Sequence, residues 1–354
     1  MDLEEKISLV RRPPTEEIVT VPELRELFET EEHPTHYIGF EISGLLHLGT
    51  LIVSGNKVRD LIEAGVKTKV FLADWHSVIN NKLGGDWEKI RTASDYYREA
   101  FQTYAPGAEV VMGSELYHGN DEYWRDIIKF SKHVTLARAS RTLTIMGRSM
   151  KDTVDIASFL YPSMQAVDIH HLHADIAHAG IDQRKVHMLA REVYPSMGWK
   201  PPVALHHHIL LGLEKPVASG LDEDARVDTI VSAKMSKSKP RTAIFIHDSS
   251  EEIQEKLARA WCPEASAELN PVLELVKYVI FHDFKEFEVD RPAKFGGPVT
   301  YSTYGEVEAA YTGKALHAAD LKRATAVYVD KIVSDLRRKF DGHRRRLEEI
   351  MKES

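Results

Sequence analysis

Hydrophobic and polar positions follow two different periods along the first 245 residues. The β-branched and aromatic segment THYIGFEIS (35–43) predicts a strand, and a Gly-rich turn follows it. Residues 51–65 carry apolar side chains at helical spacing, with Gly65 as a stop signal. Further strands are predicted at 66–78, 109–115, 174–182 and 202–213. Strands that alternate with helix-length segments indicate a parallel sheet with right-handed crossovers.

The pattern changes after residue 248. Asp-Ser-Ser-Glu-Glu (248–252) supplies a helix N-cap and an acidic first turn. Ile332, Leu336 and Phe340 mark one apolar stripe of a helix near the end of the chain. We therefore expect a Rossmann-like, doubly wound α/β part over residues 1–245 and a mainly α-helical part over residues 246–354.

Composition excludes several classes of protein. The 354 residues include 46 Lys and Arg against 54 Asp and Glu, a net charge of −8, which argues against a generally basic nucleic-acid-binding surface. The single cysteine, Cys262, can form neither an internal disulfide nor a cysteine metal site, which fits a reducing compartment. Neither a signal peptide nor an apolar run of ~18–20 residues is visible, so we expect a cytoplasmic protein.

Charge is distributed unevenly along the chain. Residues 1–32 carry a net charge of −6, residues 125–151 a net charge of +6, and residues 320–354 a net charge of +3. A solvated helix face is the simplest explanation of each run. A local RNA-binding surface in the basic stretch 125–151 is the alternative.

Two short motifs are suited to phosphate chemistry. GLLHLGT (44–50) lies between the first predicted strand and its helix, where doubly wound sheets bind ligands. His47 can donate to a phosphate oxygen, and Gly49 lets a nucleotide approach the backbone. KMSKS (234–238) places lysines and serines in one loop, which suits a developing polyphosphate charge. Either motif alone has a plainer explanation, packing or solvent exposure, but their combination is specific.

The pair resembles the HIGH and KMSKS signatures of class I aminoacyl-tRNA synthetases. The wider segments YIGFEISGLLHLGT, LADWHS, YPSMQAVDIH and GIDQRKVHMLARE are similar to those of tyrosyl-tRNA synthetases of the archaeal/eukaryotic type. The resemblance runs from about residue 30 to about residue 330. It differs from the family pattern at Thr50, where the motif has a second histidine, and at 214–233, which resembles an insertion.

The resemblance implies a tyrosine–tRNA ligase. Such an enzyme joins L-tyrosine to ATP, giving tyrosyl-adenylate and pyrophosphate, and transfers the tyrosyl group to the terminal adenosine of tRNA(Tyr). ATP, with Mg²⁺ on its phosphates, is a substrate, and no protein-ligated metal is expected. The residues implied in ATP binding and catalysis are His47, Gly49, Thr50, Lys234, Met235, Ser236, Lys237 and Ser238.

The same resemblance implies a pocket for tyrosine. Tyr161, Gln165 and Asp168 are spaced i, i+4 and i+7, which places them on one helix face. Tyr37 and Asp168 are expected to hold the substrate hydroxyl, and Tyr161, Gln165 and Gln183 its ammonium group. His76 is a neighbour of the site by resemblance and could equally be a packed core histidine.

RNA contacts are implied in both parts of the chain. Arg141, Arg184 and Lys185 are expected near the first base pair of the acceptor stem. In an anticodon-binding domain over residues 246–354, Phe295 would stack on the first anticodon base, and His317 and Asp320 would hydrogen-bond or position it. A helical connective insertion at about 115–160 is a candidate interface of a homodimer.

Three alternatives remain at this level. Eighteen histidines suggest a metal site, but three adjacent histidines on a strand (206–208) point to alternating faces and cannot meet one ion. A tryptophanyl enzyme of the same subclass is disfavoured by Tyr37 and Asp168. A catalytically inactive RNA-binding paralogue is disfavoured by the intact KMSKS segment, although Thr50 leaves it open.

Overall fold

The structure is a computed structural model that describes residues 1–147, 154–220 and 224–352. Arg148 and Lys151 of the predicted basic stretch lie outside the described residues, as do residues 221–223 of the segment 214–233. Among the described residues, no helix combines the length and apolar composition that a membrane crossing requires.

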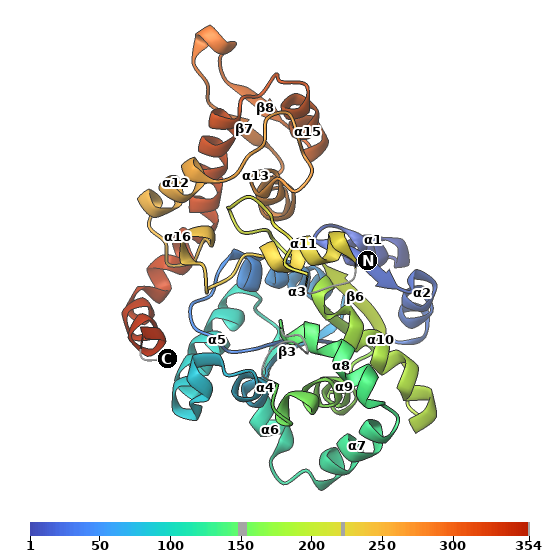
Figure 1. The fold of residues 1–354 in the computed structure, drawn as a ribbon. Helices are drawn as coiled ribbons and strands as arrows, with labels where there is room; N and C mark the ends of the chain where they lie inside the picture. The colour runs from blue at the N-terminus through green and yellow to red at the C-terminus, as the bar shows by residue number, and fades with distance from the viewer. Residues whose placement is uncertain (148–153, 221–223, 353–354) are drawn as a thin grey trace.

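Helices and strands alternate along most of the chain (Figure 1). The strands are β1 (Thr15–Val19), β2 (Thr35–Phe40), β3 (Lys67–Leu72), β4 (Glu109–Met112), β5 (Ile176–Gly180), β6 (Val203–His207), β7 (Phe287–Val289) and β8 (Val299–Tyr301). The α-helices are α1 (Leu3–Arg11), α2 (Val21–Thr30), α3 (Ser54–Glu63), α4 (Asp74–Ile79), α5 (Trp87–Tyr104), α6 (Gly113–Tyr117), α7 (Asp121–Lys132), α8 (Leu136–Thr142), α9 (Tyr161–His171), α10 (Arg184–Val193), α11 (Ala225–Ala233), α12 (Ser250–Arg259), α13 (Pro271–Leu275), α14 (Phe281–Asp283), α15 (Tyr304–Thr312) and α16 (Ala318–Lys352).

Short helical turns connect these elements. Two are π-helical, η1 (Leu48–Val53) and η8 (Val276–Ile280). The 3-10 turns are η2 (Lys82–Gly85), η3 (Leu143–Met146), η4 (Ala157–Phe159), η5 (Ile181–Gln183), η6 (Tyr194–Met197), η7 (Pro240–Thr242) and η9 (Ala293–Phe295).

The central sheet has the strand order β1-β6-β5-β2-β3-β4. β6, β5, β2, β3 and β4 are parallel, and β1 pairs antiparallel with β6 at one edge. From β2 the chain moves outward to β3 and β4, and then returns to β5 on the other side of β2. The fold is therefore doubly wound, as predicted, and its direction of winding reverses between β2 and β5.

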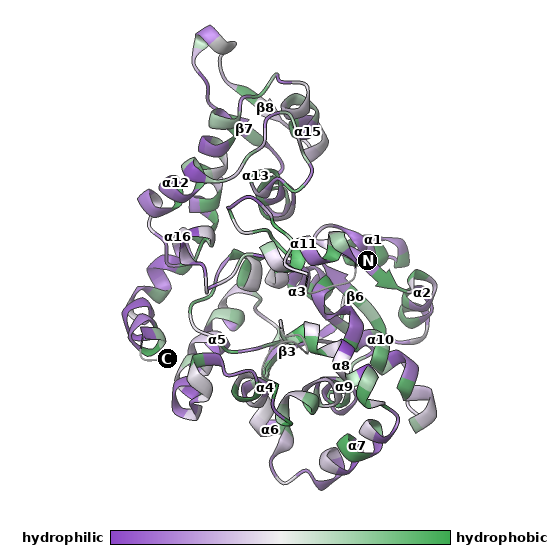
Figure 2. Cartoon of the chain, in the orientation of Figure 1, coloured by the Kyte–Doolittle hydropathy of each residue, from purple (hydrophilic) through white to green (hydrophobic). Residues whose placement is uncertain are grey.

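Alternate residues of the strands face different hydrophobic clusters. Ile38 and Val70 pack with α3 and α5, whereas Tyr37 and Phe71 pack with α9 and α10 on the opposite face. The side-chain period of two places one helical layer on each face of the sheet. Figure 2 shows hydrophobic and hydrophilic residues mixed along α16, whose buried residues include Val333, Leu336 and Phe340.

Several predicted strands are too long. The segment 66–78 is a strand only to Leu72 and continues as α4, and 109–115 ends as a strand at Met112 before α6. The segment 202–213 is a strand only to His207. After β6 an apolar run continues past the carboxyl end of the strand, because Leu210, Leu211 and Leu213 are also buried, so hydrophobicity alone does not mark its end. After β3 and β4 the buried residues Asp74 and Gly113 begin the next helix.

The part after residue 248 is mainly helical, as predicted, with one addition. Ser249 caps α12 and accepts a hydrogen bond from the backbone N–H of Glu252 at 3.2 Å. The addition is the antiparallel pair β7–β8, which was not predicted. One hydrophobic cluster includes residues from both sides of residue 246, for example Ile38 and Phe340. The domain boundary near 246 stays a prediction.

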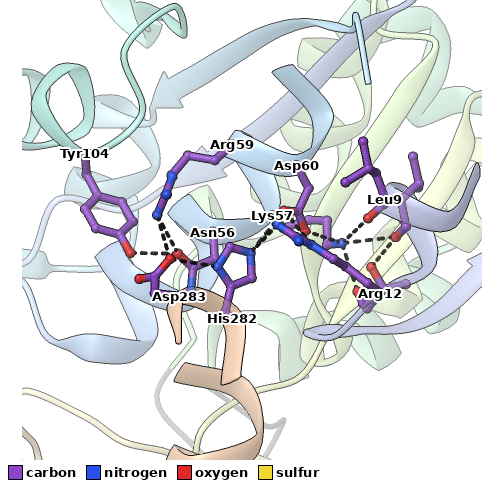
Figure 3. A network of polar contacts seen from close by, with 11 residues as sticks. Leu9, Arg12, Asn56, Lys57, Arg59, Asp60, Tyr104, His282 and Asp283 are labelled. Carbon is purple, nitrogen blue, oxygen red and sulfur yellow. Dashed lines mark hydrogen bonds and ion pairs between the residues drawn. The ribbon is translucent and has the colours of Figure 1, made fainter. Parts of the chain in front are cut away.

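A buried ion network joins three distant segments (Figure 3). On α3, Asp60 accepts from Arg12 Nε at 2.8 Å, and its Oδ2 lies 2.8 Å from Lys57 Nζ. His282 Nε2, on α14, lies 3.0 Å from Asp60 Oδ1, and Lys57 also donates to the carbonyl of Leu9 at 2.9 Å. Burial raises the pKa of Asp60, but His282, Arg12 and Lys57 more than offset this and lower it to about 2. The network ties α3 to both α1 and α14.

Candidate active site

A cleft of about 610 Å³ opens at the carboxyl ends of β2, β3, β5 and β6. Its walls include the first motif, around His47, and the KMSKS segment, around Lys234. The two motifs are far apart in sequence, and the antiparallel bridge between His47 and Phe245 brings their flanks together. The cleft lies where the winding of the sheet reverses, which is the usual ligand site of this architecture.

The first motif presents a neutral histidine to the cleft. His47 is buried, and its Nε2 lies 3.0 Å from Thr50 Oγ1. Burial, with smaller contributions from Lys237 and Lys234, lowers the pKa of His47 to about 3. A Cβ on Gly49 would lie only 3.1 Å from the His47 ring, so a glycine at position 49 leaves room for the ring in this position. His47 and Thr50 can therefore hydrogen-bond a phosphate without adding charge.

The KMSKS segment supplies the positive charge. Lys234 Nζ donates to Asp182 Oδ2 at 2.9 Å, and Lys237 Nζ donates to Ser43 Oγ at 2.7 Å. Burial raises the pKa of Asp182, but Lys234 more than offsets this and holds it below its ordinary value. The N–H of Met235 bonds to Leu210 O at 2.7 Å, which fixes the base of the loop. Ser236 and Ser238 also line the cleft.

Tyr37 and Asp168 form a polar site deep in the cleft. Both side chains are buried, and Asp168 is fully so. Asp168 Oδ1 accepts from the hydroxyls of Tyr117 and Tyr123 at 2.9 and 2.8 Å. Its Oδ2 has no hydrogen-bond partner among the described residues, since His76 Nε2 is 3.6 Å away. A buried carboxylate oxygen without a donor is an acceptor available to a ligand.

The residues predicted to hold an ammonium group also line the cleft. Tyr161, Gln165 and Asp168 project from one face of α9, and Gln183 lies in η5. Tyr161 OH donates to Glu41 Oε1 at 3.0 Å, and Gln165 Nε2 lies 3.4 Å from Gln183 Oε1. Gln165 Oε1 is buried without a hydrogen-bond partner in the described part of the chain. The structure thus brings all five predicted tyrosine-site residues to one cleft.

Sequence reasoning missed two acidic residues that line the cleft, Glu41 and Asp182. It also missed three residues that hydrogen-bond to the lining: Asn80, Tyr117 and Tyr123. Asp182 adjoins Gln183 within a segment that carried the resemblance, so that segment offered a signal for it. The tyrosines carried none, because a buried tyrosine is most often a core residue.

Comparison with known proteins agrees with this geometry. Residues 29–334 match the family described as tRNA synthetases class I (W and Y). The tyrosine–tRNA ligase of Pyrococcus horikoshii is 47% identical, over 98% of each chain. A crystal structure of tyrosyl-tRNA synthetase from P. horikoshii, complexed with L-tyrosine, superposes with a TM-score of 0.91 at 46% identity and full coverage of both chains.

The chain belongs to the tyrosine–tRNA ligase family. This confirms the predicted family, fold class and enzyme class. The tryptophanyl-tRNA synthetase of Plasmodium falciparum covers 99% of this chain and 87% of its own, with a TM-score of 0.66 at 16% identity. That likeness shows a shared fold alone, so the tryptophan alternative has less support.

The residues that this family resemblance assigned to the acceptor stem lie apart from the cleft interior. Arg141 is exposed at the end of α8. Arg184 begins α10 and pairs with Glu17 at 2.8 Å, and Lys185 Nζ lies 3.3 Å from Thr144 Oγ1. Their role in RNA binding stays a prediction.

The predicted anticodon residues lie in the part of the tyrosine–tRNA ligase chain after residue 246 (Figure 1). His317 precedes α16, and its Nδ1 accepts from the N–H of Ala319 at 3.2 Å. Asp320 lies in the first turn of α16 and pairs with Arg323. The backbone of Phe295 ends the turn η9. Their contacts with an anticodon stay predictions.

The histidines that suggested a metal site have other partners. His170 stacks on Trp199 at 3.7 Å, and His171 lies 3.1 Å from Asp126. Within residues 1–147, 154–220 and 224–352, no group of three or more His, Cys, Asp or Glu side chains is arranged to hold a metal ion.

His208 holds the segment that supports the KMSKS loop. Its Nδ1 lies 2.6 Å from Glu16 Oε1 on β1, and its Nε2 lies 3.1 Å from Glu274 Oε2 on α13. Glu274 also accepts from the N–H of Leu211, which bridges to Lys234. Burial lowers the pKa of His208, but the two glutamates more than offset this and raise it to about 9.

The contacts of His208 with Glu16 and Glu274 make the stability of the protein depend on pH. Because the pKa of His208 rises from 6.5 to about 9 on folding, its contribution is complete below pH 6.5 and is lost as the pH rises through about 9. We expect His208→Gln to lower the free energy of unfolding strongly near pH 6 and weakly near about pH 10. Urea denaturation at both pH values measures this, with exposed His118→Gln as the control. An equal loss at both pH values would contradict a protonated His208.

Proposed function

We infer that the protein is a tyrosine–tRNA ligase that activates L-tyrosine with ATP and then transfers it to tRNA(Tyr). The observation that carries this is the free Oδ2 of buried Asp168, next to Tyr37, in the same cleft as both phosphate motifs. A phenol hydroxyl placed there satisfies the carboxylate. Phenylalanine would leave it unpaired, and this is the principle by which such sites reject an analogue lacking the hydroxyl.

At the mouth of this pocket, polar groups suit the substrate ammonium. Gln165 Oε1 is an acceptor without a partner in the described residues, and the hydroxyl of Tyr161 can accept as well as donate. The side-chain Nε2 of Gln183 donates to Ile145 O at 2.9 Å. This orients its amide oxygen toward Gln165 Nε2. Tyrosine bound in this way has its carboxylate free to meet ATP.

At the phosphate end, catalysis is positioning and electrostatics. The tyrosine carboxylate attacks the α-phosphate of ATP in line, and pyrophosphate leaves. His47 and Thr50 hydrogen-bond the phosphates, while Lys234 and Lys237 stabilise the charge that moves onto them. No general base is required, because the attacking carboxylate is already ionised. As the loop closes over ATP, Lys234 exchanges Asp182 for phosphate oxygens, and Lys237 exchanges Ser43 and Tyr97.

Mg²⁺ enters as part of the ATP substrate. Glu41, Asp168 and Asp182 are acidic residues lining the cleft, and each accepts hydrogen bonds from protein donors. We therefore expect the phosphates and water to supply most of the ligands of Mg²⁺, as is usual for this ion.

The second half-reaction needs tRNA(Tyr). A ribose hydroxyl of its terminal adenosine attacks the tyrosyl carbonyl of the adenylate, and AMP leaves.

The residues proposed to contact the acceptor stem are Arg141, Arg184 and Lys185, and those proposed to contact the anticodon are Phe295, His317 and Asp320. Of the basic stretch, Arg138 pairs with Glu192, which lies outside the stretch. The positive charge available to RNA is thus smaller than the sequence count. A cytoplasmic location accords with this activity.

The activity is tested by ATP–pyrophosphate exchange with tyrosine, tryptophan and phenylalanine in parallel. We expect exchange with tyrosine, and a decrease of about 100-fold in kcat for Lys237→Ala, because one donor to the transition-state charge is lost. Lys339→Ala, at an exposed lysine of α16, is the control. Exchange with tryptophan alone, or with none of the three, would overturn the assignment.

The anticodon role of Asp320 is tested separately from activation. Asp320→Ala should raise the tRNA concentration required for aminoacylation, because a contact to the anticodon is lost, and should leave ATP–pyrophosphate exchange unchanged. Asp335→Ala, further along α16 in an exposed pair with Arg338, is the matched control. Loss of exchange in Asp320→Ala would refute a role confined to the anticodon.

We also propose a homodimer formed through the connective segment 115–160. Its support is three large apolar side chains that are unusually exposed, Ile128 at 66%, Leu136 at 72% and Ile156 at 86%. Light scattering of the purified protein should give the mass of two chains, and should give one chain for Ile128→Glu. A single-chain mass for the wild type would contradict the dimer.

A further inference from the structure

Asp168 depends on two tyrosines that the proposed mechanism does not use. A carboxyl group removed from water needs hydrogen-bond partners in the protein to replace those it loses. Tyr117 and Tyr123 both donate to Oδ1, at 2.9 and 2.8 Å. Both donors thus converge on one oxygen, and the other oxygen is left without a partner in the described residues.

Packing fixes where these two hydroxyls point. Tyr117 ends α6 and Tyr123 lies in the first turn of α7, and both rings are buried. Their ring centroids are 4.6 Å apart, and Tyr117 also packs edge-on against Phe71 and Trp75. Neither ring can turn away from Asp168 without opening a cavity in a close-packed cluster.

We propose that Tyr117 and Tyr123 are positioning residues for substrate selection: they fix the orientation of the Asp168 carboxyl group and reserve its Oδ2 for the hydroxyl of the amino-acid substrate. This rests on the proposed function, since the hydroxyl is that of tyrosine. With Oδ1 occupied by two donors, the substrate phenol meets a single acceptor in a fixed direction. An amino acid without the hydroxyl leaves this buried polar oxygen unsatisfied.

Titratable groups face Asp168 from each of the elements packed around it. Tyr37 faces it from β2, Asp74 and His76 from α4, Tyr117 from α6, Tyr123 from α7 and Tyr194 from η6. Burial raises the pKa of Asp168 to about 8, with Tyr123 and Tyr117 lowering it and Asp74 raising it. Loss of either donating hydroxyl therefore moves the pKa further upward, so that the carboxylate forms only at higher pH.

The test uses Tyr117→Phe and Tyr123→Phe, each of which removes one oxygen atom and keeps the ring. ATP–pyrophosphate exchange is measured from about pH 6 to pH 9 with tyrosine and with phenylalanine. We expect each variant to lower kcat/KM for tyrosine about 10-fold near pH 7 and to leave the KM for ATP unchanged. The rising limb of kcat/KM for tyrosine should move to higher pH, and the tyrosine-to-phenylalanine ratio should fall.

The matched control is Tyr194→Phe. Tyr194 belongs to the same buried cluster, but its hydroxyl donates to the carbonyl of Ala166 at 2.6 Å and not to Asp168. It should keep the wild-type pH limb and substrate ratio. The proposal is overturned if Tyr117→Phe or Tyr123→Phe, whichever folds, keeps both wild-type values, or if Tyr194→Phe changes them equally. Absence of tyrosine-dependent exchange in the wild type would instead overturn the proposed function, and this inference with it.

Discussion

The reversal of winding between β2 and β5 is the constraint on which the site depends. Because the connections after these two strands leave in opposite directions, no crossover covers the sheet edge between them, and the cleft opens there. Tyr37 reaches the cleft from β2, Asp182 follows β5, and His208 follows β6. Each side chain is placed by a strand of the rigid sheet or by a residue just beyond it.

Buried acidic residues, at that edge and elsewhere in the molecule, are balanced by specific partners. Asp168 is held by two phenols, Asp182 by Lys234, and Asp60 by Arg12 and Lys57. Breaking one side of such a pair leaves an uncompensated charge, which costs far more than an exposed pair is worth. The same physical rule thus serves the architecture at Asp60 and substrate recognition at Asp168, where one oxygen is left for the ligand.

Much of the fold was predictable because its signals are local. Strand β2, the helix ending before Gly65 and the cap of α12 depend on neighbouring residues, and all three were predicted. The ends of β3, β4 and β6 were not, because buried residues continue into the next element. The edge strand β1 is short and only partly buried, and gives no alternating pattern.

By itself the sequence determined the motifs, the family and the identity of the residues around the cleft, since these are carried by short segments in a fixed order. Only the tertiary structure decided how they act together. It brought His47 and Lys237, which are far apart in the sequence, into the lining of one cleft. It also directed the hydroxyls of Tyr117 and Tyr123, from the connective segment, to one oxygen of Asp168. It neutralised part of the apparent basic stretch, where Arg138 pairs with Glu192. Contacts between residues distant in sequence depend on how the layers pack, and no local pattern records that.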